Sequence, residues 1–276
     1  SDAAEQCRRL AKGGSALSAA KHAVTVSIVT PSFNQARFIE RTIESIRSQD
    51  GDFEVEHIVV DGGSSDGTLD ILRRHEDAVR WRSEPDDGQS DAINKGLREA
   101  QGEILAWLNS DDEYLPGALQ RVASAYRREP FAWCFGNCRN IDESGHEIRR
   151  TIARYKNRQS RRYSYGRLLR RLFIPQPSTF FTAEAYRETG EISRELHYAM
   201  DYDYWLRLGQ RYAPRHIDAD LACFRWHGAS KNGALYRKAA WEALQVARRH
   251  APPGSGYDLF WHYVHYVTLV CLYPFL

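Results

Sequence analysis

Residues 24–34 read VTVSIVTPSFN, and this stretch decides the fold. The segment 24–30 is short, β-branched and almost wholly apolar, as in a strand that is buried on both faces. Pro31 ends the strand, and apolar residues then recur at helical spacing. The same succession repeats along the first half of the chain. We expect further strands at 57–60, 79–82, 103–108 and 131–135, and helices at 38–46, 68–74, 89–100 and 116–126.

This alternation predicts an α/β fold, with a parallel sheet and helices on both of its faces. Ligands of such sheets bind beyond the carboxyl ends of the strands. Polar clusters stand at three of those ends, at Thr30–Pro31, Asp61–Gly63 and Asn109–Asp112. We therefore expect these three loops to form one site.

The second half of the chain is less regular. Ser178–Thr182 reads as a strand and Asp201–Arg211 as a helix. We expect this half to be a smaller lobe that closes over the first. The predicted division is a flexible segment 1–22, an α/β half 23–140, a second half 141–250 and a hydrophobic C-terminal segment 251–276.

The composition argues against several classes of protein. The chain of 276 residues has a formal net charge of only +2, which speaks against a nucleic-acid binder. Its five cysteines are odd in number and scattered, which favours free thiols in a reducing compartment. Cys134 and Cys138 lack a second Cys or His pair at zinc-site spacing, so we do not expect them to bind metal. No signal peptide or apolar run of about 20 residues is evident, which predicts a cytoplasmic protein.

The cluster Asn109–Asp112 follows the apolar strand ILAWL. Carboxylates at this place are costly unless a cation is bound, and Mg²⁺ or Mn²⁺ favours few carboxylates together with phosphate oxygens. A helix cap or a solvent-facing pair explains the spacing equally well. The first strand is followed neither by GxGxxG nor by GxxxxGK[ST], which argues against a dinucleotide oxidoreductase and a P-loop NTPase.

Several segments together resemble family 2 glycosyltransferases of the GT-A fold. These are VSIVTPSFN, EHIVVDGGSSDGT, SEPDDGQSDAINKGLREAQGEILAWLNSDD, QPSTFF, LHYAMDYDYWLRL and FRWHGASKN, which span about residues 24–232. Each segment alone is weak, but their order and spacing are specific. The resemblance implies a mostly parallel, Rossmann-like sheet with a smaller acceptor-side lobe. It also implies inverting transfer of a sugar from a nucleoside diphosphate sugar, a UDP-sugar by default, to a glycan or glycolipid hydroxyl.

The resemblance further implies which residues contact the donor. The loops after the first two strands hold the nucleotide, with an acid accepting from the base, through Thr30, Pro31, Asn34, Asp61 and Gly63. Asp91, Asn94 and Lys95 lie near the donor sugar and diphosphate. Asn109 and Ser110 match the start of the DxD motif, where an amide still hydrogen-bonds a ribose hydroxyl. Without the resemblance, Asp61 would be explained as a turn residue at the end of a strand. Asp91, Asn94 and Lys95 would be explained as part of an exposed helix face.

The DxD motif departs from its usual form, because Asn109 replaces the first Asp and an amide is a poorer metal ligand. The resemblance makes Asp111 the first candidate ligand of Mn²⁺ or Mg²⁺ and Asp112 the second. His227 matches a histidine that reaches the metal or the diphosphate in relatives. A packed or surface histidine is the alternative for this position.

Asp201 matches the catalytic base of the family, and Asp203 is its rival. Residues two apart on a helix point about 200° away from each other, so only one of them faces the donor. The family pattern favours Asp201, and Asp203 would then hydrogen-bond within its own lobe. Inversion by a single displacement requires a carboxylate that accepts the acceptor's proton.

Two further stretches concern the acceptor and the membrane. Arg149–Arg171 holds ten Lys or Arg and no acid, which suits either a solvated surface or an anionic partner. That partner is an acidic glycan, a lipid diphosphate or the inner face of an anionic membrane. The run Leu259–Leu276 is aromatic and aliphatic, as in an interfacial helix or a helix packed on the core, and the packed helix is preferred.

Alternatives from other classes stay open. A nucleotide-sugar-binding protein without turnover is favoured by Asn109 and opposed by the intact Asp111 and Asp201. A nucleotidyltransferase needs a basic, Gly-rich loop after the first strand, and TPSFNQ is not one. For Trp205 a core position is preferred to stacking on a sugar, and Gln176, between two prolines, is expected to line the acceptor site.

Overall fold

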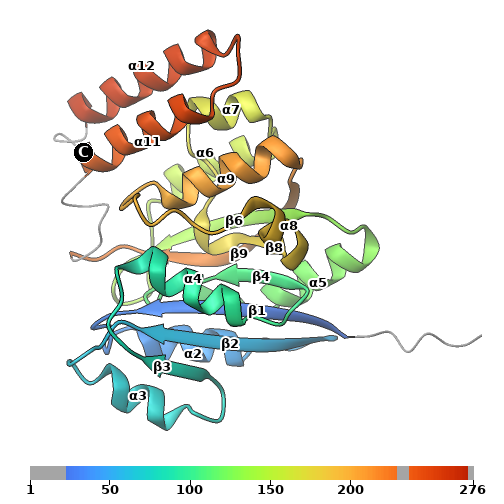
Figure 1. Cartoon of the computed structure of the whole chain (residues 1–276), viewed down its shortest axis with the longest axis vertical. Coiled ribbons are helices and arrows are strands. Elements are labelled where there is room, and N and C mark those ends of the chain that lie inside the picture. Colours follow the sequence, from blue (N-terminus) through green and yellow to red (C-terminus); the bar gives the residue numbers. More distant parts are fainter. Residues whose placement is uncertain (1–22, 229–235, 273–276) are drawn as a thin grey trace, which may run out of the picture.

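The computed structural model describes residues 23–228 and 236–272, so the predicted flexible segment 1–22 lies outside the described residues. The described chain forms one curled sheet of nine strands flanked by helices (Figure 1). Four parallel strands come first, in the order β3-β2-β1-β4, as the alternation predicts. The elements are β1 (Val24–Ser32), α2 (Ile39–Arg47), β2 (Phe53–Asp61), α3 (Thr68–Arg74), β3 (Arg80–Ser83), α4 (Gln89–Glu99) and β4 (Ile104–Trp107).

The second half does not form a separate sheet. Its strand β8 (Thr179–Thr182) pairs antiparallel with β4, and β6, β9 and β5 continue the order beyond β8. The predicted boundary at residue 140 therefore falls inside β6 (Trp133–Ile141), which pairs with both β8 and β9. The remaining elements here are β5 (Glu113–Tyr114), α5 (Ala118–Arg128), β7 (Glu147–Ile148) and β9 (Arg215–Arg225).

Helices of the second half stack outward from the sheet. Helix α9 packs beside the sheet, α7 and α11 pack on α9, and α12 packs on both, so that α12 lies at one end of the molecule (Figure 1). Their bounds are α6 (Arg150–Ser160), α7 (Tyr165–Arg170), the 3₁₀ turn η1 (Gln176–Ser178), α8 (Ala183–Thr189), α9 (Met200–Arg211), α11 (Tyr236–His250) and α12 (Gly256–Leu272). No helix in the described ranges is long and apolar enough to cross a membrane.

Three fully buried tryptophans attach α9 to the sheet. The rings of Trp107 on β4 and Trp133 on β6 both stack on Trp205 of α9, with ring centroids 5.2 and 6.0 Å away. The preferred interpretation of Trp205 as a core residue is confirmed. Because Asp201 lies one turn before Trp205, this stack also sets where that carboxylate stands.

Cysteine usage agrees with the expectation of free thiols. Cys134, Cys138 and Cys223 are buried and unbonded, and Cys271 is exposed and unbonded. Cys7 lies outside the described residues. Burial raises the pKa of the Cys134 thiol, so this residue is an unreactive part of the core.

Candidate active site

A cavity of about 650 Å³ opens where β1, β2 and β4 end. This volume is typical of a small-molecule site. All three predicted loops reach it, through Pro31, Gly62 and the segment Asn109–Asp111. The second half closes the cavity with Gln176, His197, Tyr198, Asp201 and His227. The structure thus brings together loops that are far apart in the chain, as the strand-end argument predicts.

The strongest candidate for holding a metal ion is the pair of Asp111 and His227. Asp111 Oδ2 lies 2.8 Å from His227 Nε2, and both side chains are largely buried. Two neighbouring ligands of an octahedral ion with bonds of about 2.1 Å are about 3 Å apart, so the pair fits such an ion. The described residues contain no group of three or more His, Cys, Asp or Glu placed to hold a metal. The other coordination positions would therefore fall to diphosphate oxygens and water.

Asp112 is corrected as a metal candidate. Its carboxylate is buried and does not line the cavity, because Oδ1 accepts from the Arg225 backbone N–H at 2.9 Å and Oδ2 accepts from Asn109 Nδ2 at 3.2 Å. Burial and the neighbouring Asp111 charge raise the pKa of Asp112 well above its usual range. Arg225 was not identified from the sequence; it is a fully buried arginine whose guanidinium binds the Asp111 carbonyl and the Glu113 carboxylate. An arginine inside an apolar strand segment is the signal that could have identified it.

The departure from DxD at Asn109 has a local explanation. The side chain amide lines the cavity and donates to Asp112 Oδ2 and Gln176 Oε1, while its oxygen accepts from Gln89 Nε2 at 2.8 Å. An Asp at this position would lose both donated bonds and would place a second carboxylate against buried Asp112. Gln176 also donates to the Trp107 carbonyl at 2.7 Å, which fixes it in the cavity wall. Contact of Asn109 with a ribose stays a prediction.

Only one of the two candidate bases reaches the cavity. Asp201 stands in the first turn of α9 and lines the cavity wall, and burial raises the pKa of its carboxyl to about 6. Asp203 points away and accepts from Arg207 Nε at 2.8 Å, with His250 Nε2 2.7 Å from its other oxygen. Burial raises the pKa of Asp203, but His250 and Arg207 outweigh this effect and leave it below the usual value. The catalytic roles themselves are not tested by this geometry.

Most of the predicted nucleotide residues shape the loops instead of lining the cavity. Of the nucleotide-binding residues predicted at the ends of β1 and β2, only Pro31 lines the cavity. Asp61 is fully buried and accepts from the Ser64 hydroxyl, the Ser83 hydroxyl and two backbone N–H groups of its own loop. Thr30 Oγ1 lies 2.9 Å from His57 Nε2 in the core. Asn34 Oδ1 accepts from the Ser65 N–H, and Gly63 supplies a turn with φ of 86°. Base recognition by Asp61 stays a prediction.

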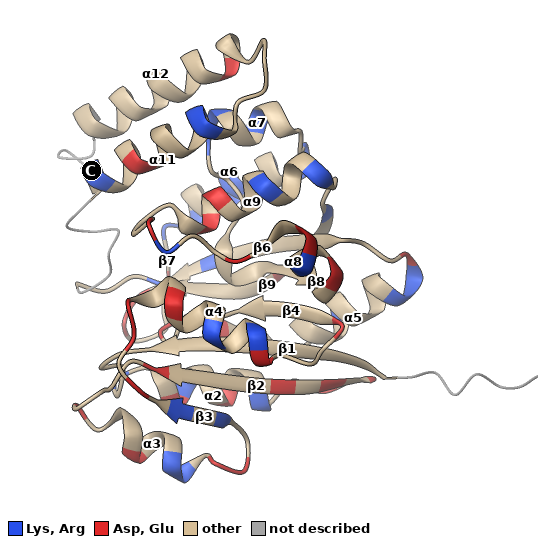
Figure 2. Cartoon of the chain, viewed as in Figure 1, with Lys and Arg blue, Asp and Glu red and all other residues tan. Residues whose placement is uncertain are grey.

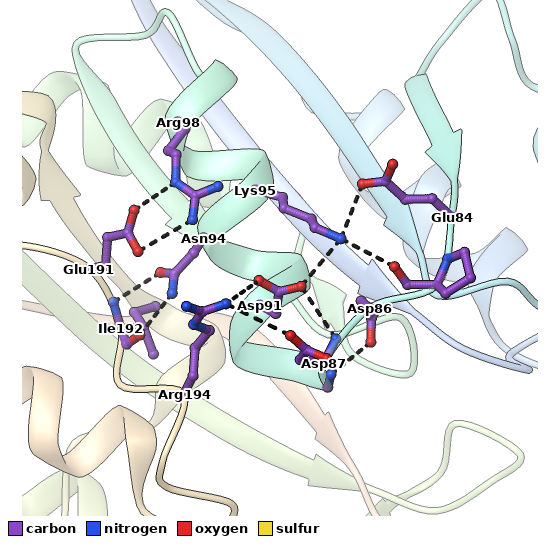
Figure 3. A network of polar contacts seen from close by, with 12 residues as sticks. Glu84, Asp86, Asp87, Asp91, Asn94, Lys95, Arg98, Glu191, Ile192 and Arg194 are labelled. Atoms are coloured by element: carbon purple, nitrogen blue, oxygen red, sulfur yellow. Dashed lines mark hydrogen bonds and ion pairs between the residues drawn. The ribbon is translucent and has the colours of Figure 1, made fainter.

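Figure 3 shows the polar contacts of the α4 residues that were expected to lie near the donor. Lys95 Nζ lies 3.1 Å from Glu84 and 3.2 Å from Asp91, and it donates to the Pro85 carbonyl at 3.3 Å. Asn94 exchanges two hydrogen bonds with the Ile192 backbone. None of the three lines the cavity. Asp91 and Lys95 hold the loop 84–88 in place, whereas Asn94 holds the backbone at Ile192.

Several lining residues were not identified from the sequence. Among them are Phe33, Asp86, Gln89, His197 and Tyr198. Each lies within a few residues of a predicted motif, which is the available signal. Phe33 keeps 60% of its surface exposed, so an aromatic ring stands open at the cavity. Ser110, predicted from the DxD motif, lines the cavity as well.

Comparison with known proteins agrees with this geometry. The family Glycosyl transferase family 2 matches residues 27–189, more than half of the chain. An uncharacterized glycosyltransferase of Mycobacterium tuberculosis is 31% identical over 192 residues, which are 67% of this chain and 69% of that protein. Chondroitin synthase of Escherichia coli is 31% identical over 207 residues, which are 72% of this chain but 28% of that protein.

Solved structures show the same fold at lower identity. TarS 1–349 of S. aureus in complex with UDP-GlcNAc has a TM-score of 0.65 and 15% identity, covering 85% of this chain and 69% of TarS 1–349. The mannosyltransferase PcManGT of Pyrobaculum calidifontis, in complex with GDP-Man and Mn²⁺, has a TM-score of 0.61 and 17% identity over 91% of this chain and 76% of its own. These structures give the fold as GT-A. With the match over residues 27–189, the chain belongs to glycosyl transferase family 2.

Proposed function

We propose that this glycosyltransferase inverts the anomeric centre while moving a hexosyl or N-acetylhexosaminyl group from a nucleoside diphosphate sugar, by default a UDP-sugar, to an acceptor hydroxyl. The pathway would be glycan, polysaccharide or glycolipid biosynthesis. The observation that carries the proposal is a single cavity with Asp201 on one wall and the Asp111–His227 pair on another. The neighbouring structures with UDP-GlcNAc and with GDP-Man and Mn²⁺ support a donor of this class.

In the proposed reaction the acceptor oxygen attacks the anomeric carbon as the diphosphate leaves from the opposite side. Asp201 accepts the acceptor's proton, for which a pKa raised to about 6 suits a base that works near neutral pH. Mn²⁺ or Mg²⁺, held by Asp111 and His227, would neutralise the charge that develops on the departing diphosphate. Gln176 and Asn109 position the wall between these two groups through their mutual hydrogen bond.

We also propose an anionic acceptor, an acidic glycan or a lipid diphosphate. The charge of Lys156 in α6 lowers the pKa of Asp201, so the two groups are in electrostatic range. Arg149 and Arg171 act on Lys156 in turn. No ion pair of Lys156 occurs among the described residues, unlike Arg161 and Arg170, which pair with Asp218 and Asp258. A cation in electrostatic range of the base, without an ion pair in the described part of the chain, favours a negatively charged acceptor.

The alternative of a nucleotide-sugar-binding protein without turnover was favoured by Asn109 alone. Because Asn109 is explained by its buried neighbour Asp112, its presence no longer argues against catalysis. The proposal keeps catalysis and predicts release of a nucleoside diphosphate when donor and acceptor are both supplied.

The test is Asp201→Asn, compared with wild type against panels of nucleotide sugars and acceptors. We expect kcat to fall by about 10²–10⁴ because the proton acceptor is lost, whereas donor affinity stays within about threefold. Asp203→Asn is the matched control, since it makes the same change two residues away and outside the cavity. The assignment would be refuted if Asp201→Asn kept a normal kcat. It would also be refuted if the loss of kcat appeared in Asp203→Asn and not in Asp201→Asn.

A further inference from the structure

Helix α12 presents an unusual face to solvent. Its 17 residues contain no Lys or Arg and one acid, Asp258, which faces inward and accepts from Arg170 Nε at 2.6 Å. A surface helix ordinarily turns polar residues outward. Here most of the outward residues are aromatic or aliphatic, and none is charged. We call them the aromatic face: Tyr257 (62% exposed), Phe260 (58%), Trp261 (43%), Tyr263 (49%) and Val267 (39%).

Contacts on the opposite side fix this orientation. His262 is buried, with Nδ1 2.6 Å from the Leu169 carbonyl and its ring stacked at 6.0 Å on Tyr202 of α9. On the same side, Asp258 accepts from Arg170 Nε. Because polar anchors hold the inner side, α12 cannot rotate to bury its aromatic face without breaking them.

Helix α11 extends this surface with positive charge. Trp241 is 49% exposed, and its ring lies 5.8 Å from Tyr266 of α12. Four exposed cations lie at helical spacing from Trp241 and so share its stripe: Arg237, Lys238, Arg248 and Arg249. In Figure 2, α12 is tan except near its start, and α11 carries Lys or Arg toward both ends. The only acid of α11, Glu242, is turned inward, where it accepts from the backbone N–H groups of residues 197–199.

We propose that the aromatic face of α12 and the cations of α11 bind together to the surface of an anionic membrane. Tyr and Trp rings favour the boundary between headgroups and acyl chains, and Lys or Arg beside them attracts anionic lipid. A second copy of the chain fits less well, because a two-fold contact would bring the cations of α11 near their own counterparts. The proposal does not depend on the catalytic assignment.

The test is flotation of the full chain with two kinds of vesicle, phosphatidylcholine alone and phosphatidylcholine with phosphatidylglycerol. We expect flotation with the anionic vesicles only, and a decrease as salt is raised. Two variants, Phe260→Ser with Trp261→Ser and Arg237→Glu with Lys238→Glu, should each lower the partition coefficient at least about tenfold. Arg127→Glu with Arg128→Glu on α5 is the control, since it makes the same charge change away from α11 and α12.

Melting curves and nucleotide binding of each variant show whether the fold is kept. Equal flotation with neutral vesicles, or unchanged flotation of both variants, would overturn the proposal. A dimer by light scattering that Phe260→Ser with Trp261→Ser dissociates, without any vesicle binding, would instead assign the face to a second copy.

Discussion

At the scale of single residues, the cavity separates carboxylates that are neighbours in the sequence. Asp111 and Asp201 face it, whereas Asp112 and Asp203 are turned into hydrogen bonds elsewhere. Asp201 and Asp203 differ in titration for this reason. Asp203 has charged partners that favour its ionised form, and Asp201 has burial that disfavours it. A carboxylate in a cavity whose pKa is raised by burial is common among catalytic bases.

Titration of Asp201 predicts how activity depends on pH. Because its pKa is about 6, we expect kcat/KM to fall below about pH 6 as one proton binds the base. The pH–rate profile of the wild type, measured with saturating metal, checks this expectation. If kcat/KM fell only near the ordinary pKa of aspartate, the result would contradict a pKa of Asp201 that is raised by burial.

The same shift predicts an effect on stability. The folded pKa of Asp201 lies above the unfolded value, so the folded chain loses stability as the pH rises through about 6. Asp201→Asn should therefore raise the free energy of unfolding by about 1–3 kcal/mol at pH 8, with no gain below about pH 4. Asp203→Asn should instead lower the free energy of unfolding at pH 8. The lowered pKa of Asp203 stabilises the fold at pH values above the pKa of the unfolded chain, and the substitution removes this contribution. Denaturant titrations at both pH values measure the two differences.

At the scale of elements, α4 acts as a support for the loop 84–88. Pro85, Asp86 and Gly88 of this loop line the cavity, and Lys95 binds the loop at the Pro85 carbonyl and at Glu84. The residues of α4 that resemble donor ligands therefore position the cavity wall from outside.

This role of α4 predicts a specific kinetic change. Lys95→Met should raise KM for the donor by about 3–10-fold with little change in kcat, because the loop is loosened while the reacting groups stay in place. Arg98→Met on the same helix is the control, since Arg98 pairs with Glu191 and does not touch the loop. A large loss of kcat in Lys95→Met would instead favour the prediction that Lys95 lies near the donor sugar and diphosphate.

At the scale of the whole molecule, the cavity lies between the two halves, and we expect metal and nucleotide to bind there together. UDP with Mn²⁺ should raise the melting temperature more than either does alone, because each completes the site of the other. Asp111→Ala should remove the Mn²⁺-dependent part of that increase. Asp86→Ala removes another carboxylate of the cavity wall and should keep the Mn²⁺-dependent increase in melting temperature. Thermal-shift measurements with and without a chelator check this expectation. An Mn²⁺-dependent increase that persists in Asp111→Ala would exclude Asp111 as a metal ligand.

The prediction of the fold was accurate where the pattern is local. The strands β1 to β4 and the helices between them follow from apolar periodicity and turn residues. The strand β9 reads RHIDADLACFR and was not predicted, because its charged first half has no strand signal of its own. Its pairing with β6 and β5 supplies the stabilisation that its composition lacks. The same pairing joined the expected second lobe to the first sheet.

The sequence by itself determined the fold class, the family and the loops that form the cavity, because these depend on contiguous residues and on the order of short motifs. Only the tertiary structure decided which side chains of those loops face the cavity. Asp112 is turned away by Arg225, 113 positions further along the chain. Such contacts between distant residues orient each side chain, and no local pattern encodes them.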